Sequence, residues 1–145
     1  MDENVVPVFE GLEWDPNAPD AVLIQNDQGT ACLALNAHHA DSDRRAVVLV
    51  WSGCHRGVMG SPNDEAVHHH RLADAGLRNV MWIGEVENSA WIDELAPMSY
   101  RPPTRHFVVR TKEQVVEVVA NDMSTVRIPG PTTDAALEAL DPEHT

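Results

Sequence analysis

The feature that most constrains the fold of this chain is a succession of short apolar runs, several of them rich in valine, separated by tight turn signals. Short β-branched runs are typical of β-strands, and Asn, Asp and Gly between them tolerate the backbone angles of hairpin turns. The runs within 21–36 and within 105–120 are each predicted to form a hairpin. The predicted strands are 21–25, 30–36, 46–52, 79–87, 105–111, 114–120 and 125–128. The run 5–9 is a candidate edge strand, where proline is tolerated.

Helical segments are few and short. One helix is predicted near 62–69, with Ser61 as its N-cap and Pro62 as its first helical residue. Another is predicted at 90–96, and a weak, frayed helix at 134–140. Because short turns join the strands, the sequence predicts an α+β fold, with a mainly antiparallel sheet or half-barrel of hairpins and two or three short helices.

The length of 145 residues corresponds to one domain. We divide the chain into an acidic, proline-interrupted N-terminal extension at 1–20, a single α+β domain at 21–128 and a C-terminal tail at 129–145. The start of the chain lacks the basic and apolar regions of a signal peptide. No apolar run approaches the roughly 20 residues that cross a bilayer, so a cytoplasmic location is expected.

The formal net charge of −13 restricts the partners of the chain. A negative field of this size repels nucleic-acid phosphates and anionic membranes, so neither is predicted as a partner. The charge favours a basic protein partner or a cationic ligand, although acidic surfaces also serve solubility alone. The sequence leaves open whether the protein forms a homodimer.

Reactive side chains are densest in the segment 49–72, which is interpreted as a buried strand, a loop with three glycines and a capped helix start. Trp51 is most simply a core residue, and Cys54 is most simply a buried, inert thiol. Trp51 could instead line a ligand pocket, since such pockets combine apolar walls with a few polar groups. Cys54 could instead be a nucleophile, with its thiolate favoured by His55, Arg56 and the helix start near Pro62. The candidate ligand-binding residues are Trp51, Cys54, His55 and Asn63.

The candidate catalytic residues are Asp64, Glu65, His70 and His106. Carboxylates and imidazoles are the side chains that most often move protons in general acid–base catalysis. Asp64 and Glu65 also have a structural explanation, because acidic residues stabilise the first turn of a helix. His106 and Phe107 are neighbours in a predicted strand, so their side chains point to opposite faces of the sheet. An inward-facing His106 would need a hydrogen-bond partner, for which Asp64 and Glu65 are the candidates.

The consecutive histidines His68, His69 and His70 raise the question of a metal site. Successive side chains on a helix point about 100° apart, so these three cannot chelate one ion together. The chain has no H-E-x-x-H motif and no paired C-x-x-C motif that would supply further ligands. No metal site and no cofactor are predicted.

An ordered pattern runs through about residues 49–120 and comprises Gly60-Ser-Pro-Asn-Asp-Glu-Ala66, His70, Leu72, Gly76-Leu77, Asn88-Ser-Ala-Trp-Ile92 and Arg105-His-Phe107. It resembles a family of small bacterial proteins of unknown function. Where that family has Gly-His-Pro-Leu, this chain has His69-His70-Arg71-Leu72, so His70 and Leu72 match. The resemblance implies no activity. It points to Asn63, Asp64, Glu65, His70 and His106 as the polar positions to test.

The leading hypothesis is a small-molecule-binding protein of bacterial metabolism, with its site between the 53–65 loop and the 105–120 hairpin. In its sharper form, the protein is an acid–base enzyme that needs no cofactor, such as an isomerase, cyclase or lyase. The alternative is an acidic protein-interaction module, such as an immunity or antitoxin-like protein. An enzyme is expected to bury a carboxylate whose pKa is perturbed, whereas an interaction protein spreads carboxylates over an exposed face. The sequence alone leaves open whether the protein is an enzyme.

Overall fold

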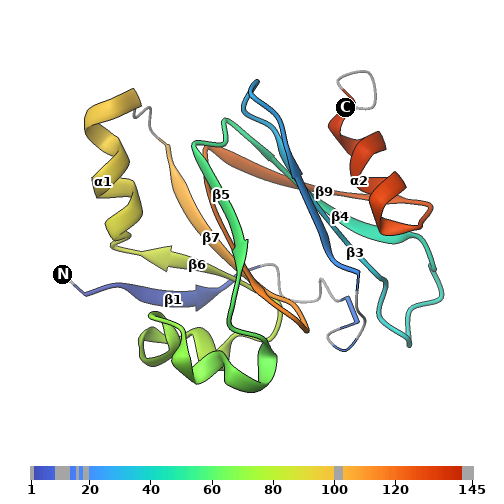
Figure 1. The fold of residues 1–145 in the computed structure, drawn as a ribbon, viewed down its shortest axis with the longest axis horizontal. Helices are drawn as coiled ribbons and strands as arrows, with labels where there is room; N and C mark the ends of the chain where they lie inside the picture. Colours follow the sequence, from blue (N-terminus) through green and yellow to red (C-terminus); the bar gives the residue numbers. More distant parts are fainter. Residues whose placement is uncertain (1, 9–13, 16, 18–19, 100–102, 142–145) are drawn as a thin grey trace.

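The computed structural model of the chain describes residues 2–8, 14–15, 17, 20–99 and 103–141, and within these residues nine strands form two antiparallel sheets (Figure 1). The sheets pack face to face, and short helices lie against their outer faces. The predicted α+β class, built mainly of antiparallel hairpins, is confirmed.

One sheet has five strands in the order β1–β6–β7–β8–β5. Its strands are β1 Asn4–Pro7, β5 Arg56–Gly60, β6 Ile83–Glu87, β7 Arg105–Arg110 and β8 Val115–Ala120. The β7–β8 hairpin is the one predicted from 105–120. Its register pairs His106 with Val119 and Val108 with Glu117, which places His106 and Glu117 on the same face as diagonal neighbours.

The other sheet has four strands in the order β2–β3–β4–β9. Its strands are β2 Val22–Gln25, β3 Ala31–Leu35, β4 Ala46–Ser52 and β9 Asp122–Ile128. Although β9 follows β8 directly in the chain, it pairs with β4. The chain therefore passes between the sheets at Asn121, whose backbone N–H lies 3.1 and 3.2 Å from the carbonyl oxygens of Ser52 and Gly53.

The main core lies between the two sheets, because alternate residues of each strand face the partner sheet. Phe107 of β7 points into this core, as do Val116 and Val118 of β8. The alternation consequently places His106 and Glu117 on the outer face of the five-stranded sheet.

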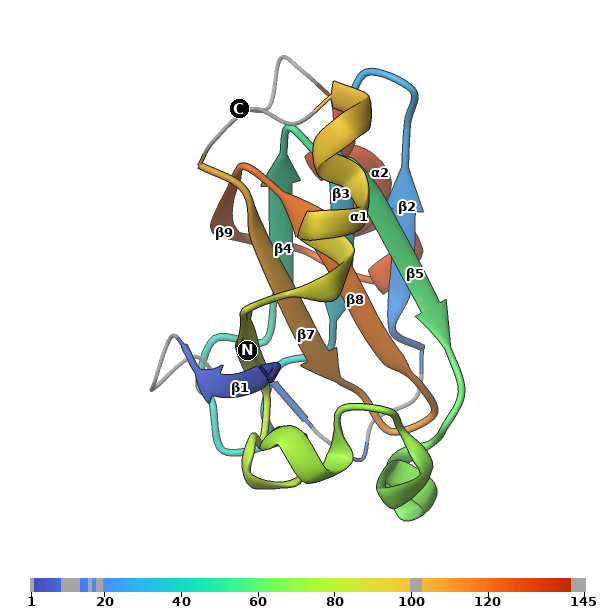
Figure 2. The same cartoon turned by 90° about the vertical axis from the view of Figure 1, so that its left-hand side faces the viewer.

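Two groups of helices cover the outer face of the five-stranded sheet (Figure 2). Near one end of this face lies the helix α1, Ala90–Ser99, which packs over β7. Near the other end lie the 3₁₀-helices η1 Asp64–His69, η2 Ala73–Ala75 and η3 Leu77–Asn79. Leu72 and Leu77 from this second group are buried against Val108 and Val115 of the sheet. Both groups thus shield side chains that alternation directs away from the main core.

The helix α2, Thr132–Leu140, covers the outer face of the four-stranded sheet. Ala135, Ala136 and Ala139 are buried there against Val48 and other residues of the sheet. The helix predicted at 134–140 is present, and only the expectation that it is weak and frayed is wrong. Its small alanine side chains let the helix approach the sheet closely. None of the described helices is long and apolar enough to span a membrane.

Two predictions about the segment 53–65 are also wrong. Residues 56–60 form β5 and not a loop, since they pair along their whole length with β8 despite the weak strand preference of two glycines. The N-cap of the helix η1 is Asn63 and not Ser61. The side chain of Asn63 accepts a hydrogen bond from the backbone N–H of Ala66 at 3.1 Å.

We expect Gly76→Ala to destabilise the fold by more than about 1–2 kcal/mol, the usual conformational cost of a left-handed residue with a side chain. Gly76 has φ +116°, and an added Cβ would lie 2.6 Å from the carbonyl oxygen of Val5. Gly60 is a matched control, because a Cβ there meets nothing within 4 Å. Urea denaturation should show a large loss for Gly76→Ala and a small change for Gly60→Ala. Equal effects would contradict the described packing of β1 against Gly76.

Candidate functional site

A buried carboxylate, Glu117 of β8, forms the centre of the candidate site. The residue is 7% exposed. Its Oε1 lies 2.9 Å from Nε2 of His106 and 2.8 Å from Nη2 of Arg71, and its Oε2 lies 3.3 Å from Nε2 of His70. Two imidazoles and one guanidinium therefore converge on a single carboxylate.

Segments far apart in the chain supply these groups. His106 reaches Glu117 diagonally across the β7–β8 hairpin, whereas His70 and Arg71 follow directly after η1. At the start of α1, Ser89 places its Oγ 2.6 Å from Nδ1 of His106. Trp91, in the first turn of α1, stacks on the His106 ring with centroids 4.9 Å apart and planes inclined by 10°. We call Glu117, His70, Arg71, Ser89, Trp91 and His106 the Glu117 cluster.

The hydrogen-bond partners determine where the protons of the two imidazoles lie. The backbone N–H of Leu72 donates to Nδ1 of His70 at 3.0 Å, so the proton of a neutral His70 is on Nε2, facing Glu117. The backbone N–H of Ile92 donates to Oγ of Ser89 at 3.2 Å, which leaves the Ser89 hydroxyl to donate to His106. His106 then also donates to Glu117 through Nε2, and both histidines satisfy the carboxylate while neutral.

Glu117 is ionised throughout the physiological pH range. Burial is the largest influence on the pKa of Glu117 and acts to raise it. The hydrogen bonds from His106 and His70 and the charge of Arg71 together outweigh burial and lower the pKa from 4.5 to about 2. Glu117 therefore acts as a fixed negative charge that holds its partners and not as a group that exchanges protons near neutral pH.

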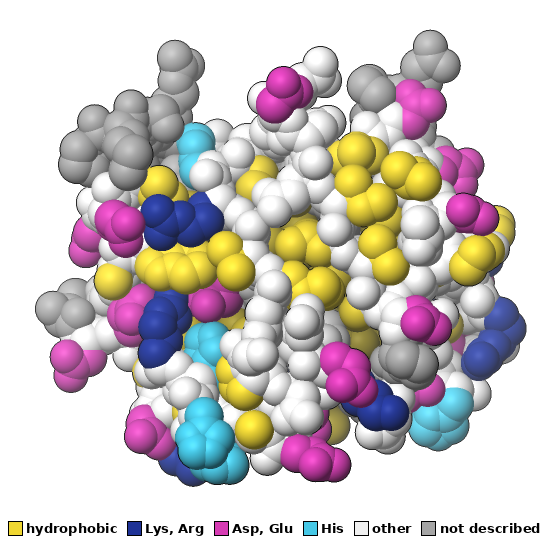
Figure 3. All heavy atoms as spheres, in the orientation of Figure 1, with side chains coloured by type: hydrophobic (Ala, Val, Ile, Leu, Met, Phe, Trp, Pro, Cys, Tyr) yellow, Lys and Arg dark blue, Asp and Glu magenta, His cyan; other side chains and the backbone are white. Residues whose placement is uncertain are grey.

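The outer side of the cluster is partly open to solvent. Arg71, whose side chain is 38% exposed, has its guanidinium carbon 4.8 Å from the centroid of the Trp91 ring. Arg56 of β5 places its guanidinium carbon 5.0 Å from the same ring and pairs with Glu94 at 3.2 Å. In the space-filling view of Figure 3, basic and hydrophobic side chains adjoin one another in the region between α1 and β5.

The opposite side of the cluster is closed by the N-terminal segment. Oε2 of Glu3 accepts a hydrogen bond from the backbone N–H of Ala90 at 3.1 Å, and the side chain of Asn88 donates to the carbonyl oxygen of Asp2 at 3.2 Å. Ser89, between these two contacts in the chain, is only 4% exposed. The Oγ of Ser89 accepts a hydrogen bond from the backbone N–H of Ile92, and its hydroxyl donates to Nδ1 of His106. Ser89 is therefore placed to orient the imidazole.

Of the predicted catalytic residues, the structure brings His70 and His106 together and leaves the two acids elsewhere. The expected pairing of His106 with Asp64 or Glu65 is wrong, because His106 bonds Glu117 and Ser89. Asp64 instead forms an ion pair with Arg110, four residues along β7 from His106, which is about 13 Å at the usual rise of a strand. Asn63, Asp64 and Glu65 line a separate hollow of about 180 Å³ together with Asn17, Lys112 and Glu113.

The other predicted ligand-binding residues are also placed away from Glu117. Trp51 is fully buried in the core between the sheets, with its ring 6.2 Å from that of Phe107. Cys54 is half-buried, and burial raises the pKa of its thiol, which disfavours the reactive thiolate. His55 has Nε2 3.2 Å from Oδ1 of Asn121, at the point where the chain changes sheets. The positions of Trp51, Cys54 and His55 are consistent with roles in packing and in holding the chain where it changes sheets.

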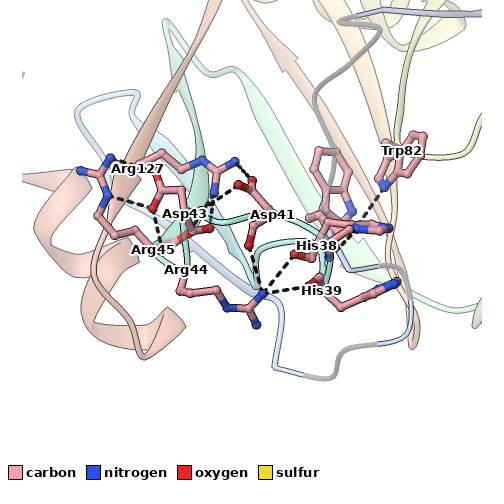
Figure 4. Close-up of polar contacts among 10 residues, drawn as sticks. His38, His39, Asp41, Asp43, Arg44, Arg45, Trp82 and Arg127 are labelled. Atoms are coloured by element: carbon pink, nitrogen blue, oxygen red, sulfur yellow. Dashed lines mark hydrogen bonds and ion pairs between the residues drawn. The ribbon is translucent and has the colours of Figure 1, made fainter.

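A second polar network, in the loop between β3 and β4, also has a structural role (Figure 4). Arg44 donates to the carbonyl oxygens of His38, His39 and Asp41, and Arg127 of β9 pairs with Asp41. The rings of His38 and His39 stack with centroids 4.2 Å apart. These contacts fasten the loop to β9. Among the described residues, no group of three or more His, Cys, Asp or Glu side chains is arranged to hold a metal ion.

Sequence reasoning missed Glu117 itself, although one signal for it was present. Glu117 is the one charged residue in the apolar run 114–120, and an acid inside a strand covered on both faces must find hydrogen-bonding partners. Ser89 belongs to the ordered pattern at 88–92, but its contact with His106 required the three-dimensional structure.

Fold and site together define a two-sheet α+β protein with a buried carboxylate held by two histidines and an arginine. No family model, curated protein or solved structure matches the chain. The resemblance to a family of small bacterial proteins therefore stays a prediction. Four residues of its pattern, His70, Ser89, Trp91 and His106, meet in the Glu117 cluster.

Proposed function

We propose that the protein binds a small molecule against the open side of the Glu117 cluster and acts on it by acid–base chemistry without a cofactor. The observation that carries this proposal is the convergence of two imidazoles on one buried carboxylate, at 2.9 and 3.3 Å. Clusters of this kind position proton-transfer groups in enzymes, because a fixed carboxylate orients an imidazole and stabilises its protonated form.

The geometry suggests a distinct role for each group. His70, whose side chain is 8% exposed, is the proposed acid–base group. His106 is fully buried with both ring nitrogens hydrogen-bonded, and it is proposed to hold Glu117 in position. His70 makes the longer contact to Glu117 and is the imidazole more easily released to a ligand. Glu117 stabilises either imidazole when it is protonated, and Ser89 keeps His106 in one orientation. Isomerases, cyclases and lyases rely on proton transfers of this kind.

A ligand would approach from the side on which Trp91 and Arg71 are partly exposed. The Ser89 side is covered by the segment that contains Asp2 and Glu3. The acidic side chains visible in Figure 3 are dispersed and do not form one continuous patch on this face. The dispersed acids give little support to the alternative of an acidic interaction surface. The buried Glu117 gives more support to a small-molecule site.

A thermal-shift screen with a library of metabolite-sized compounds tests the proposal. A ligand at 100 times its dissociation constant stabilises the folded protein by about 2.7 kcal/mol, which corresponds to a shift of several degrees in Tm. We expect Glu117→Gln and His70→Ala to abolish the shift produced by a wild-type ligand. Glu65→Gln is the matched control, because Glu65 lines the separate hollow near Lys112.

A ligand whose shift disappears in both cluster variants and persists in Glu65→Gln supports the proposal. Shifts that survive Glu117→Gln and His70→Ala would place the ligand elsewhere and reject the site. Each variant is compared with its own ligand-free Tm, so that a change in basal stability is not mistaken for a loss of binding.

A further inference from the structure

Two arginines from separate segments meet at one aromatic ring on the open side of the Glu117 cluster. The guanidinium carbons of Arg71 and Arg56 lie 4.8 and 5.0 Å from the centroid of the Trp91 ring. Contacts of this length are cation–π interactions, which hold a guanidinium in a defined position beside the ring. The chain has 10 basic residues against 23 acidic ones, so two of its few cationic side chains lie at one ring.

Both guanidinium groups retain hydrogen-bonding capacity for a ligand. A guanidinium has five N–H donors. Arg71 uses Nη2 for Glu117, and Arg56 uses Nη2 for Glu94. The side chains of Arg71 and Arg56 are 38% and 27% exposed, so solvent reaches them.

The pairing of Arg56 with Glu94 is readily displaced. The side chain of Glu94 is 59% exposed, and its contact with Arg56 is 3.2 Å long. Exposed ion pairs of this kind contribute little stability, because water and salt compete for both charges. An incoming oxyanion can therefore replace the Glu94 carboxylate on Arg56 at little energetic cost.

We infer that the ligand of the Glu117 cluster carries an oxyanion, a carboxylate or a phosphate, which Arg56 and Arg71 bind beside the ring of Trp91. The inference rests on the proposed function, since it names the ligand class for the same site. Arginine recognises carboxylate and phosphate through paired N–H donors. The net charge of the chain pointed toward a cationic ligand, whereas the local arrangement of side chains favours an anionic one.

The experiment uses benzoate and phenyl phosphate as probes and benzamide as their uncharged counterpart. Each is titrated into the full chain while the indole N–H signal of Trp91 is followed by NMR. We expect one or both anions to shift this signal with an affinity at least about tenfold higher than that of benzamide, as charge-assisted hydrogen bonds require. Comparison of the two anions shows whether the carboxylate or the phosphate is the better ligand.

Variants test which residues bind the anion. Arg56→Gln and Arg71→Gln are each expected to weaken binding about tenfold or more, and Glu94→Gln is expected to strengthen it by freeing Arg56. Arg78→Gln is the matched control, because Arg78 is an exposed arginine paired with Asp74 in a different part of the fold. Equal binding of benzamide and the anions, or binding unchanged in Arg56→Gln and Arg71→Gln, would overturn the inference.

These outcomes are separable from those of the proposed function. If neither anion shifts the Trp91 signal, the inference fails even when the screen yields a ligand that depends on Glu117 and His70. If the anions bind through both arginines, the inference is supported. A library ligand that is then insensitive to Glu117→Gln and His70→Ala would count against the acid–base proposal alone.

Discussion

Replacement of Glu117 by alanine is expected to lower the free energy of unfolding by about 3–5 kcal/mol, the usual cost of removing one partner from a buried ionic network. The substitution leaves the Nε2–H groups of His70 and His106 without their acceptor. His106 is fully buried, so water cannot substitute for the lost carboxylate there. Arg71 loses the same partner but is exposed enough to reach solvent, which limits its contribution.

Urea denaturation of wild type and Glu117→Ala at neutral pH measures this effect. The control is Glu113→Ala, which removes an exposed carboxylate from the turn between β7 and β8 of the same hairpin. Surface substitutions of that kind usually change stability by less than about 0.5 kcal/mol. A loss below about 1 kcal/mol in Glu117→Ala would contradict the buried network.

The second large effect is a dependence of stability on pH. The pKa of Glu117 is lowered from 4.5 to about 2 in the folded protein, which corresponds to about 3 kcal/mol of stability. Above about pH 4.5 the carboxylate is ionised in both the folded and the unfolded chain, and this contribution is complete. Between pH 4.5 and 2 the unfolded chain takes up the proton first, so the contribution falls and disappears below the folded pKa.

Glu117→Gln isolates this contribution, because glutamine has the same shape and does not titrate. Other groups also titrate in acid, among them Asp41 and Asp43, whose pKa values are lowered mainly by hydrogen bonds from Arg127 and Arg45. The informative quantity is therefore the difference in unfolding free energy between wild type and Glu117→Gln, measured by urea denaturation from pH 7 downward. We expect this difference to diminish below pH 4.5. A difference that stays constant with pH would show that Glu117 is not selectively stabilised in its ionised form.

Local sequence patterns were sufficient for most of the strands and for half of the proposed acid–base site. The valine-rich run 114–120 and its partner 105–111 predict the β7–β8 hairpin, because alternation and turn residues act between neighbours in the chain. His70 and His106 were predicted as catalytic candidates from their residue type and their neighbours in the sequence. Both contact Glu117, although nothing in the local pattern connected the two histidines with that residue.

The elements that sequence reasoning misplaced are those whose stability comes from distant contacts. The segment Arg56–Gly60 has two glycines and little strand preference of its own, and it is a strand because β8 supplies hydrogen-bond partners. The alanines of α2 show little amphipathic pattern, yet they are buried against β3 and β4. Local propensity predicted a helix at 134–140, but it predicted neither the burial of that helix nor the strand Arg56–Gly60.

The sequence by itself determined the α+β class, the two hairpins and the choice of histidines, since these depend on periodicity and side-chain chemistry within short segments. Only the tertiary structure decided which acid the histidines contact. Asp64 and Glu65 are closer to His70 along the chain, but their helix turns them toward Arg110 and Lys112. Glu117 lies beside His106 because the strand register places both residues on one face of the sheet. Because the carboxylate is buried, it needs hydrogen-bond donors from the protein.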